Sequence, residues 1–209
     1  MRIEKAEPAG QSTSWLLLTL ADGTRMKVPA ESALEMDALA GHELCEEELA
    51  RLKADAAKAR TKERAIRTIT ASAVSEKELQ KRLVQKGASG EDAEETVAWL
   101  RELHLLSDTD TAAQLVRSAA AKGYGAARVK SILYEKGIPR DLWDAALEEL
   151  PEMDDAIDRF LHQRLDGQTL DDKRIKKTAD ALLRRGHSWQ DIREGLRRYR
   201  EGLDLEDME

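Results

Sequence analysis

Cysteine, proline and aromatic residues are scarce in this chain of 209 residues, which contains 1 Cys, 4 Pro and only 4% Phe, Trp and Tyr. The lone cysteine, Cys45, excludes an internal disulfide and favours a reducing compartment. The longest apolar run, Trp15 to Leu18, is far too short to span a membrane, and the first residues do not resemble a signal peptide. We therefore expect a cytoplasmic protein that makes no membrane contact.

Motifs for catalysis and for metal or cofactor binding are missing as well. The sequence has no His-Glu-x-x-His pair, no Walker lysine loop and no cysteine cluster. Gly123-Tyr124-Gly125 begins like a dinucleotide fingerprint, but Arg128 occupies the position of the third glycine. We expect a protein without enzyme activity, catalytic residues, cofactor or metal.

Charge is abundant, and it is segregated along the chain. The net charge is -7, yet residues 173–200 contain 10 basic and 3 acidic side chains, and the last nine residues contain five acidic and no basic ones. Such a basic segment favours a polyanionic partner, with the acidic tail as an internal competitor. The alternative is a solvated helix face beside a frayed terminus.

The first thirty residues have the character of β-strands. Residues 15–20 and 25–28 are β-prone runs on either side of Asp22-Gly23, a dipeptide typical of tight hairpin turns. Residues 2–6 are a candidate third strand. From Glu46 onward strand signals vanish and apolar residues recur at helical spacing.

Three glycines that each follow a basic residue punctuate the helical part: Gly87, Gly137 and Gly186. A leucine stands four residues before each of them, and an apolar residue stands ten after. Ser89 and Ser188 have the spacing of helix N-caps. A basic residue and then glycine suit the end of a helix, so each glycine marks a turn between two helices. The matched positions predict a threefold repeat whose units stack on their neighbours.

These patterns predict a mainly α protein, an elongated tandem array of three three-helix repeats that resemble helix-turn-helix units. A small N-terminal β-hairpin and a linking helix precede the array. The predicted boundaries are 1–45 for the hairpin module with a short helix, 46–64 for the linking helix, 65–106, 107–150 and 151–201 for the repeats, and 202–209 for the acidic tail.

A helix-turn-helix outline also raises the question of DNA binding. The helices after Gly87 and Gly137 are acidic, so DNA would repel them, and only the helix after Gly186 is basic enough to approach phosphates. Trp99, Trp143 and Trp189 are at helical spacing from apolar residues, which favours a core position over base stacking. Any DNA contact should be weak, non-specific and local to the third repeat.

Several short motifs resemble those of the RecX family of regulatory proteins. Ser75-Glu76-Lys77-Glu78-Leu79, Leu83 and Lys86-Gly87 resemble the first unit of that family. Leu106-Ser107-Asp108, Lys122-Gly123-Tyr124-Gly125 and Lys136-Gly137-Ile138 resemble the second unit, which is the most characteristic part. The similarity extends over roughly residues 65–200, with the third unit supported mainly by the repeat spacing.

The resemblance implies a non-enzymatic modulator that lies along the groove of the RecA filament on single-stranded DNA. Such a protein blocks filament growth and lowers the ATPase, strand-exchange and co-protease activities of RecA in recombination, DNA repair and the SOS response. We expect a monomer. Four basic residues of the second repeat are candidates for contact with RecA: Arg117, Lys122, Arg128 and Lys130. Six in the third are candidates for contact with RecA or DNA: Lys176, Lys177, Arg184, Arg185, Arg193 and Arg197.

The residues leave other interpretations open. Each of these basic side chains can also serve only to solubilise an exposed helix face. The whole chain can equally be a DNA-binding regulator that acts through the third repeat, or a passive scaffold for an unrelated protein.

Overall fold

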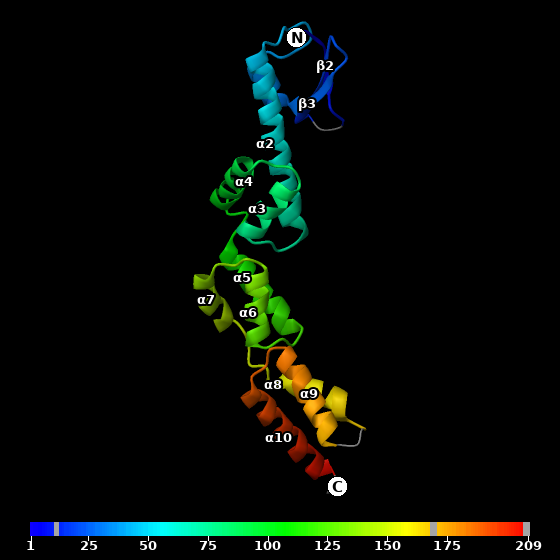
Figure 1. Ribbon diagram of the computed structural model, residues 1–209, viewed down its shortest axis with the longest axis vertical. Helices are drawn as coiled ribbons and strands as arrows, with labels where there is room; N and C mark the ends of the chain where they lie inside the picture. The colour runs from blue at the N-terminus through cyan, green and yellow to red at the C-terminus, as the bar shows by residue number, and fades with distance from the viewer. Residues whose placement is uncertain (11–12, 168–170, 207–209) are drawn as a thin grey trace. The chain divides into compact units, whose positions relative to one another are not determined.

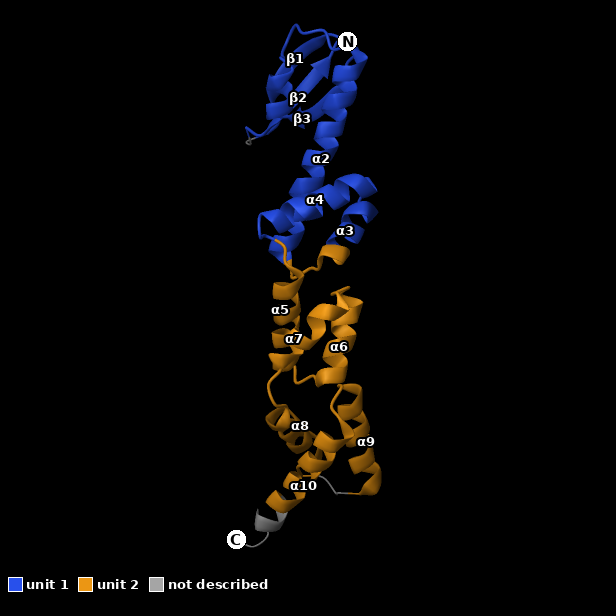
Figure 2. Cartoon of the chain, turned by 90° about the vertical axis from the view of Figure 1, so that its left-hand side faces the viewer, with its two compact units in different colours: residues 1–71, 79–105 blue, residues 72–78, 106–209 orange. Residues whose placement is uncertain are grey.

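The computed structural model describes residues 1–10, 13–167 and 171–206, with side chains up to residue 202. The chain forms two compact units: residues 1–71 with 79–105, and residues 72–78 with 106–209 (Figure 2). Helices dominate, as the sequence predicts.

An antiparallel sheet in the order β1-β2-β3 opens the first unit (Figure 1). Its strands are β1 (Ile3–Pro8), β2 (Trp15–Leu20) and β3 (Arg25–Pro29). The predicted turn joins β2 to β3: Gly23 has a φ of 81° and the Asp22 carboxylate accepts a hydrogen bond from the backbone of Thr24 at 2.9 Å. The candidate third strand is also present, so the hairpin is part of a three-stranded sheet.

Helices α1 (Ala30–Glu35) and α2 (Glu46–Ala71) belong to the same unit as the sheet. Leu52 of α2 joins Ile3, Leu18, Leu20 and Val28 in one buried core. The linking helix was expected to end near residue 64, but α2 continues without a break to Ala71 because no glycine or proline interrupts it. Its last turns therefore serve as the first helix of the first repeat, beside α3 (Glu76–Gln85) and α4 (Gly90–Glu102).

The second unit contains two further groups of three helices, each with its own core. The first group is α5 (Asp108–Ala121), α6 (Ala126–Glu135) and α7 (Trp143–Glu148), with a 3₁₀ turn, η1 (Arg140–Leu142), before α7. The second is α8 (Asp154–Leu165), α9 (Asp172–Arg184) and α10 (Trp189–Glu206). Helix α10 runs beyond the predicted repeat boundary at 201, so part of the expected tail is helical; residues 207–209 lie outside the described chain.

The three repeat glycines occupy the same local geometry, which confirms the repeat. Gly87, Gly137 and Gly186 have φ angles of 92°, 73° and 89°. After each glycine the next backbone N–H donates to the carbonyl of the predicted leucine five residues earlier, at 3.1, 3.0 and 3.2 Å. This is the Schellman pattern, in which a residue with positive φ ends the helix and satisfies its last carbonyls. The leucines are buried: Leu83, Leu133 and Leu182.

The predicted caps at Ser89 and Ser188 are formed, and Ser107 caps α5 in the same way. Each serine accepts a hydrogen bond from the backbone N–H three residues later, at 3.0 Å for Ser89, 3.1 Å for Ser107 and 3.1 Å for Ser188. The expectation for Trp189 was wrong: its side chain is 53% exposed, because the first turn of α10 presents this position to solvent rather than to α8.

Candidate interaction site

The second and third repeats meet backbone to backbone. The N–H of Gly125, just before α6, donates to the Arg185 carbonyl at 2.9 Å, and the N–H of Ala127 donates to the Gly186 carbonyl at 3.2 Å. A Cβ added at Gly125 would lie 2.3 Å from the Gly186 oxygen, and one added at Gly186 would lie 2.2 Å from the Arg128 nitrogen. Only glycine at both positions allows this approach. We call this contact the repeat joint.

Arg185 is built into the repeat joint. Its guanidinium donates to the carbonyls of Lys122 and Gly123 and lies over the rings of Tyr124 and Phe160, 5.2 Å from each centroid. Sequence reasoning had selected Arg185 as a partner-binding residue. The structure gives this side chain a set of intramolecular contacts that hold the two repeats together.

His187 occupies the same joint and is 5% exposed. Its Nε2 lies 3.1 Å from the Gly123 carbonyl, to which it donates as the neutral tautomer, while Nδ1 has no partner among the described residues. Burial lowers the pKa of His187, and the nearby Arg185 acts in the same direction; the Gly123 carbonyl and Asp191 oppose them. The joint therefore favours the uncharged ring.

The lowered pKa predicts that acid weakens the second unit. Above the unfolded-state pKa of about 6.5, the stability that the neutral ring contributes is fully present. As the pH falls from there through the lower folded-state pKa, the unfolded chain binds a proton that the folded joint resists, so the free energy of unfolding decreases. NMR titration of the ring should give a midpoint below 6.5. Urea unfolding of His187→Gln should depend less on pH than that of the wild type in this range; an equal dependence would contradict the assignment.

The segment before α3 is tied to the second repeat in a comparable way. The Ser75 hydroxyl donates to the Lys136 carbonyl, and the Lys136 ammonium lies 3.4 Å from the Glu78 carboxylate. The Asp108 carboxylate accepts the backbone N–H of Glu76 at 2.8 Å. Burial raises the pKa of Asp108, and the hydrogen bond from Glu76 opposes that rise. The two contacts follow the same plan. The start of α3 holds the turn that follows α6, and the start of α6 holds the turn that follows α9.

The candidate residues of the second repeat are of two kinds: two arginines in ion pairs within the chain and two exposed lysines. Arg117 pairs with Glu149 at 2.9 Å and Arg128 with Glu135 at 3.0 Å, both at exposed sites. The Lys122 and Lys130 side chains are exposed. Lys130 is four residues before Tyr134, so the two share the solvent face of α6. Tyr134 is 68% exposed, the highest value among the exposed large hydrophobic residues that the structure describes.

Sequence reasoning missed Tyr134. The signal was present, because the position three residues before a repeat glycine is exposed in every repeat: Val84 is 45% exposed and Leu183 is 42% exposed. In a helix that ends with a Schellman turn, this position points away from the buried leucine that precedes it. We call Lys130 and Tyr134 the α6 face.

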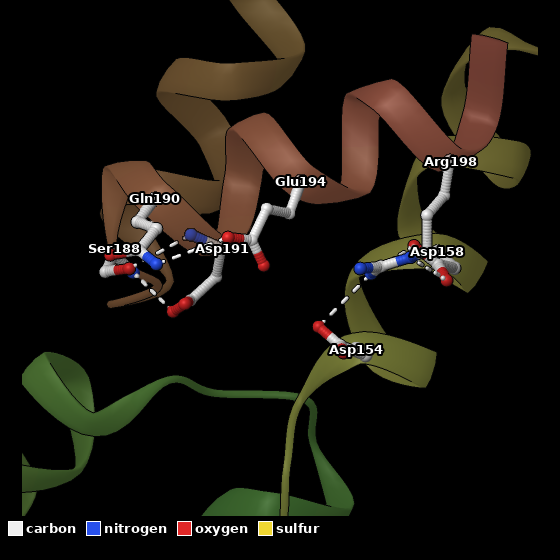
Figure 3. A network of polar contacts seen from close by, with 7 residues as sticks. All are labelled: Asp154, Asp158, Ser188, Gln190, Asp191, Glu194 and Arg198. Carbon is white, nitrogen blue, oxygen red and sulfur yellow. Dashed lines mark hydrogen bonds and ion pairs between the residues drawn. The ribbon is translucent and has the colours of Figure 1, made fainter. Parts of the chain in front are cut away.

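In the third repeat, α10 is fixed to α8 by a polar network (Figure 3). Arg198 donates to both carboxylate oxygens of Asp158, at 3.0 and 2.9 Å, and pairs with Asp154 at 3.2 Å. At the start of α10, Ser188 and Asp191 exchange hydrogen bonds as a capping box. Of the α10 candidates, Arg193 is exposed and Arg197 pairs with Glu201 at 2.8 Å.

A groove of about 460 Å³ runs along α9 and the end of α8. It brings together the predicted residues Lys177 and Arg184, whereas the exposed Lys176 is not among its lining residues. Three further cations line the groove: Arg164, Lys173 and Arg174. Arg164 was missed because it belongs to the preceding helix, and only folding brings it beside α9.

Two other kinds of site are absent from the described residues, a metal site and a membrane-spanning helix. Among residues 1–10, 13–167 and 171–206, no three His, Cys, Asp or Glu side chains gather as they would around a metal ion. No helix in the described part of the chain combines the length and apolar character needed to cross a bilayer.

Comparison with known proteins gives one consistent family. A family model described as "RecX, second three-helix domain" matches residues 107–147. The regulatory protein RecX of Escherichia coli (strain K12) is 31% identical over 153 residues, which cover 68% of this chain and 92% of that protein. The regulatory protein RecX of Shigella dysenteriae serotype 1 (strain Sd197) is 35% identical over 101 residues, or 44% of this chain and 61% of that protein.

Solved structures show the same fold. A crystal structure of regulatory protein RecX has a TM-score of 0.66 at 23% identity and covers 92% of this chain and 98% of its own. The crystal structure of RecX from Lactobacillus salivarius has a TM-score of 0.57 at 19% identity and covers 68% of this chain and 96% of its own. The repeat geometry, the motifs and the extent of the identity lead to the same conclusion: this chain belongs to the RecX family of regulatory proteins.

Proposed function

We propose that this protein binds the RecA filament on single-stranded DNA and inhibits its growth, ATPase, strand exchange and co-protease activity, without catalysis of its own. It would act as a cytoplasmic monomer. The proposal rests on membership of the RecX family, whose name describes regulation, and on the α6 face as the contact.

The α6 face is the observation that carries the proposal. A tyrosine that is 68% exposed costs solvation free energy that a partner can recover. Tyrosine is enriched at the centres of protein interfaces, where aromatic side chains and arginine contribute most of the binding energy. This face lies in residues 107–147, the segment that the RecX family model matches.

Two arginines of the second repeat form exposed ion pairs that acidic groups of a partner can replace. Arg117 and Arg128 are paired with glutamates at exposed sites, and exposed ion pairs contribute only about 0–1 kcal/mol. An acidic partner surface can therefore replace Glu149 or Glu135 at little cost. Charges of this kind raise association rates and set orientation more than they raise affinity.

The test is the ATPase of RecA on single-stranded DNA at increasing concentrations of this protein. Lys130→Glu with Tyr134→Ser should raise the half-inhibitory concentration about tenfold or more, because loss of an interface anchor commonly costs 1–2 kcal/mol. Both side chains are exposed, so the helicity should stay unchanged.

A matched control makes the same pair of changes in the first unit. Lys5 and Leu34 are also an exposed lysine and an exposed large hydrophobic residue, the latter 62% exposed. Lys5→Glu with Leu34→Ser should leave the half-inhibitory concentration within about twofold of the wild type. Unchanged inhibition by the α6 variant would remove this face from the interface, and absence of inhibition by the wild type would overturn the proposal itself.

A further inference from the structure

The groove along α9 collects five cations around one carboxylate. Arg164 from α8 and Lys173, Arg174, Lys177 and Arg184 from α9 line it. The carboxylate is Asp171, whose Oδ1 already accepts the backbone N–H of Arg174 at 2.6 Å as the N-cap of α9. The groove therefore has a large local excess of positive charge, although the whole chain carries -7.

Four of the five cations have no counterion in the described part of the chain. Lys173, Lys177 and Arg184 take part in no ion pair there, in contrast to Arg197 and Arg198 on α10. Arg164 lies over the Phe160 ring, 5.4 Å from its centroid. Like charges held close together without counterions repel one another, and an anion relieves that repulsion. The groove is thus electrostatically complementary to an anion that spans it.

The spacing of the cations shows what size of anion fits. Lys173, Lys177 and Arg184 are four and seven residues apart, so they lie on one face of α9. With a rise of 1.5 Å per residue, they extend over about 16 Å of helix axis. A single phosphate would reach only one or two of them, whereas successive phosphates along a strand can reach all of them.

The rest of the lining distinguishes a nucleic acid from an acidic protein. Between the cations the groove is lined by Thr178 and Ala181, which are small. Among its described lining residues there is no aromatic or large apolar side chain, the kind of anchor that protein interfaces use at their centre. Contacts with a phosphate backbone need only cations and hydrogen-bond donors. Trp189 is exposed but is not among the lining residues.

We propose that the α8–α9 groove binds the sugar-phosphate backbone of a nucleic acid strand, without reading its bases. This inference does not depend on the proposal for RecA, because it concerns a different surface of the same unit. Arginine can engage a phosphate through two parallel N–H groups, and lysine acts as a point charge. Because none of the described residues that line the groove is aromatic, we expect stacking on bases to contribute nothing to binding.

The direct test is fluorescence anisotropy with the full chain and two single strands of equal length, one of thymidines and one with abasic sites throughout. Both should bind with affinities within about threefold of each other. The logarithm of the association constant should fall against the logarithm of the salt concentration with a slope of about -2 to -3, as expected for three or four phosphates. A duplex of the same length shows whether the groove also accepts a base-paired backbone.

The variant Lys173→Gln, Lys177→Gln, Arg184→Gln should weaken binding at least tenfold and reduce the steepness of the salt slope by about 2. All three side chains are exposed, so the fold should persist. A matched control removes two lysines and one arginine from exposed sites of the first unit: Lys5→Gln, Lys53→Gln, Arg67→Gln. It should bind within about twofold of the wild type.

Three outcomes would overturn the inference. An equal loss in the control would mean that net charge, and not the groove, determines binding. Much tighter binding of thymidine than of the abasic strand would mean that bases are contacted. A polyglutamate peptide that binds through the groove as tightly as the abasic strand would assign it to an acidic protein. Inhibition of the RecA ATPase, measured on the same variants, reports separately on the α6 face.

Discussion

Gly186→Ala is expected to lower the free energy of unfolding of the second unit by about 4 kcal/mol, whereas Gly87→Ala should lower that of the first unit by only about 1–2 kcal/mol. The two glycines end equivalent helices with φ angles of 89° and 92°, so the backbone strain of an alanine is the same at both. They differ in what the added Cβ meets. At Gly186 it would lie 2.2 Å from the Arg128 nitrogen, and at Gly87 nothing lies within 4 Å.

The difference between the two variants measures the steric cost of placing a side chain in the repeat joint. Hydrogen exchange measured by mass spectrometry follows each unit separately, because protection of α6 and α9 reports on the second unit and protection of α3 and α4 on the first. Gly186→Ala should lose protection on both sides of the joint. Equal destabilisation by the two variants would mean that the joint contributes no close packing.

Leu182→Ala should destabilise the third repeat by about 2–5 kcal/mol, the usual cost of a cavity left by a buried leucine. Leu182 is fully buried in a core with Ile157, Leu161 and Ile192. The neighbouring Leu183 is 42% exposed, so Leu183→Ala provides a control with the same chemical change. Its cost should stay below about 1 kcal/mol, because surface substitutions rarely exceed that.

Urea unfolding followed by circular dichroism measures both leucine variants under the same conditions. The expected order is wild type, then Leu183→Ala, then Leu182→Ala, with decreasing denaturation midpoints. A midpoint for Leu183→Ala as low as that for Leu182→Ala would show that the two positions do not divide into core and surface.

Much of the fold follows from the sequence because its signals are local. A glycine that ends a helix, a serine that begins one and a leucine at a fixed offset act within one turn, so the spacing of Gly87, Gly137 and Gly186 predicts the repeat. The same local signals misplaced two boundaries. Helix α2 continues past residue 64 because no glycine or proline interrupts it, whereas α10 continues past residue 201 through Gly202, a residue that weakens a helix without always ending it.

The candidate site was harder to predict because its residues act across repeats. Arg185 has the appearance of a solvent-exposed cation in the sequence, yet it reaches two carbonyls and two rings of the neighbouring helices. Arg164 enters the groove only through the packing of α8 on α9. Trp189 has core-like spacing and is exposed. Periodicity gives the face of a helix but not the distance to its neighbours.

Helix α9 begins earlier, relative to its repeat glycine, than the equivalent helices of the first two repeats. Helix α3 begins 11 residues before Gly87, and α6 begins 11 residues before Gly137. The first turn of each of these helices holds the glycine turn of the next repeat. Helix α9 begins 14 residues before Gly186. The extra residues, 172–174, follow the Asp171 cap and include Lys173 and Arg174, two of the five cations that line the α8–α9 groove. The added turn therefore extends the basic face of α9 toward its N-terminus.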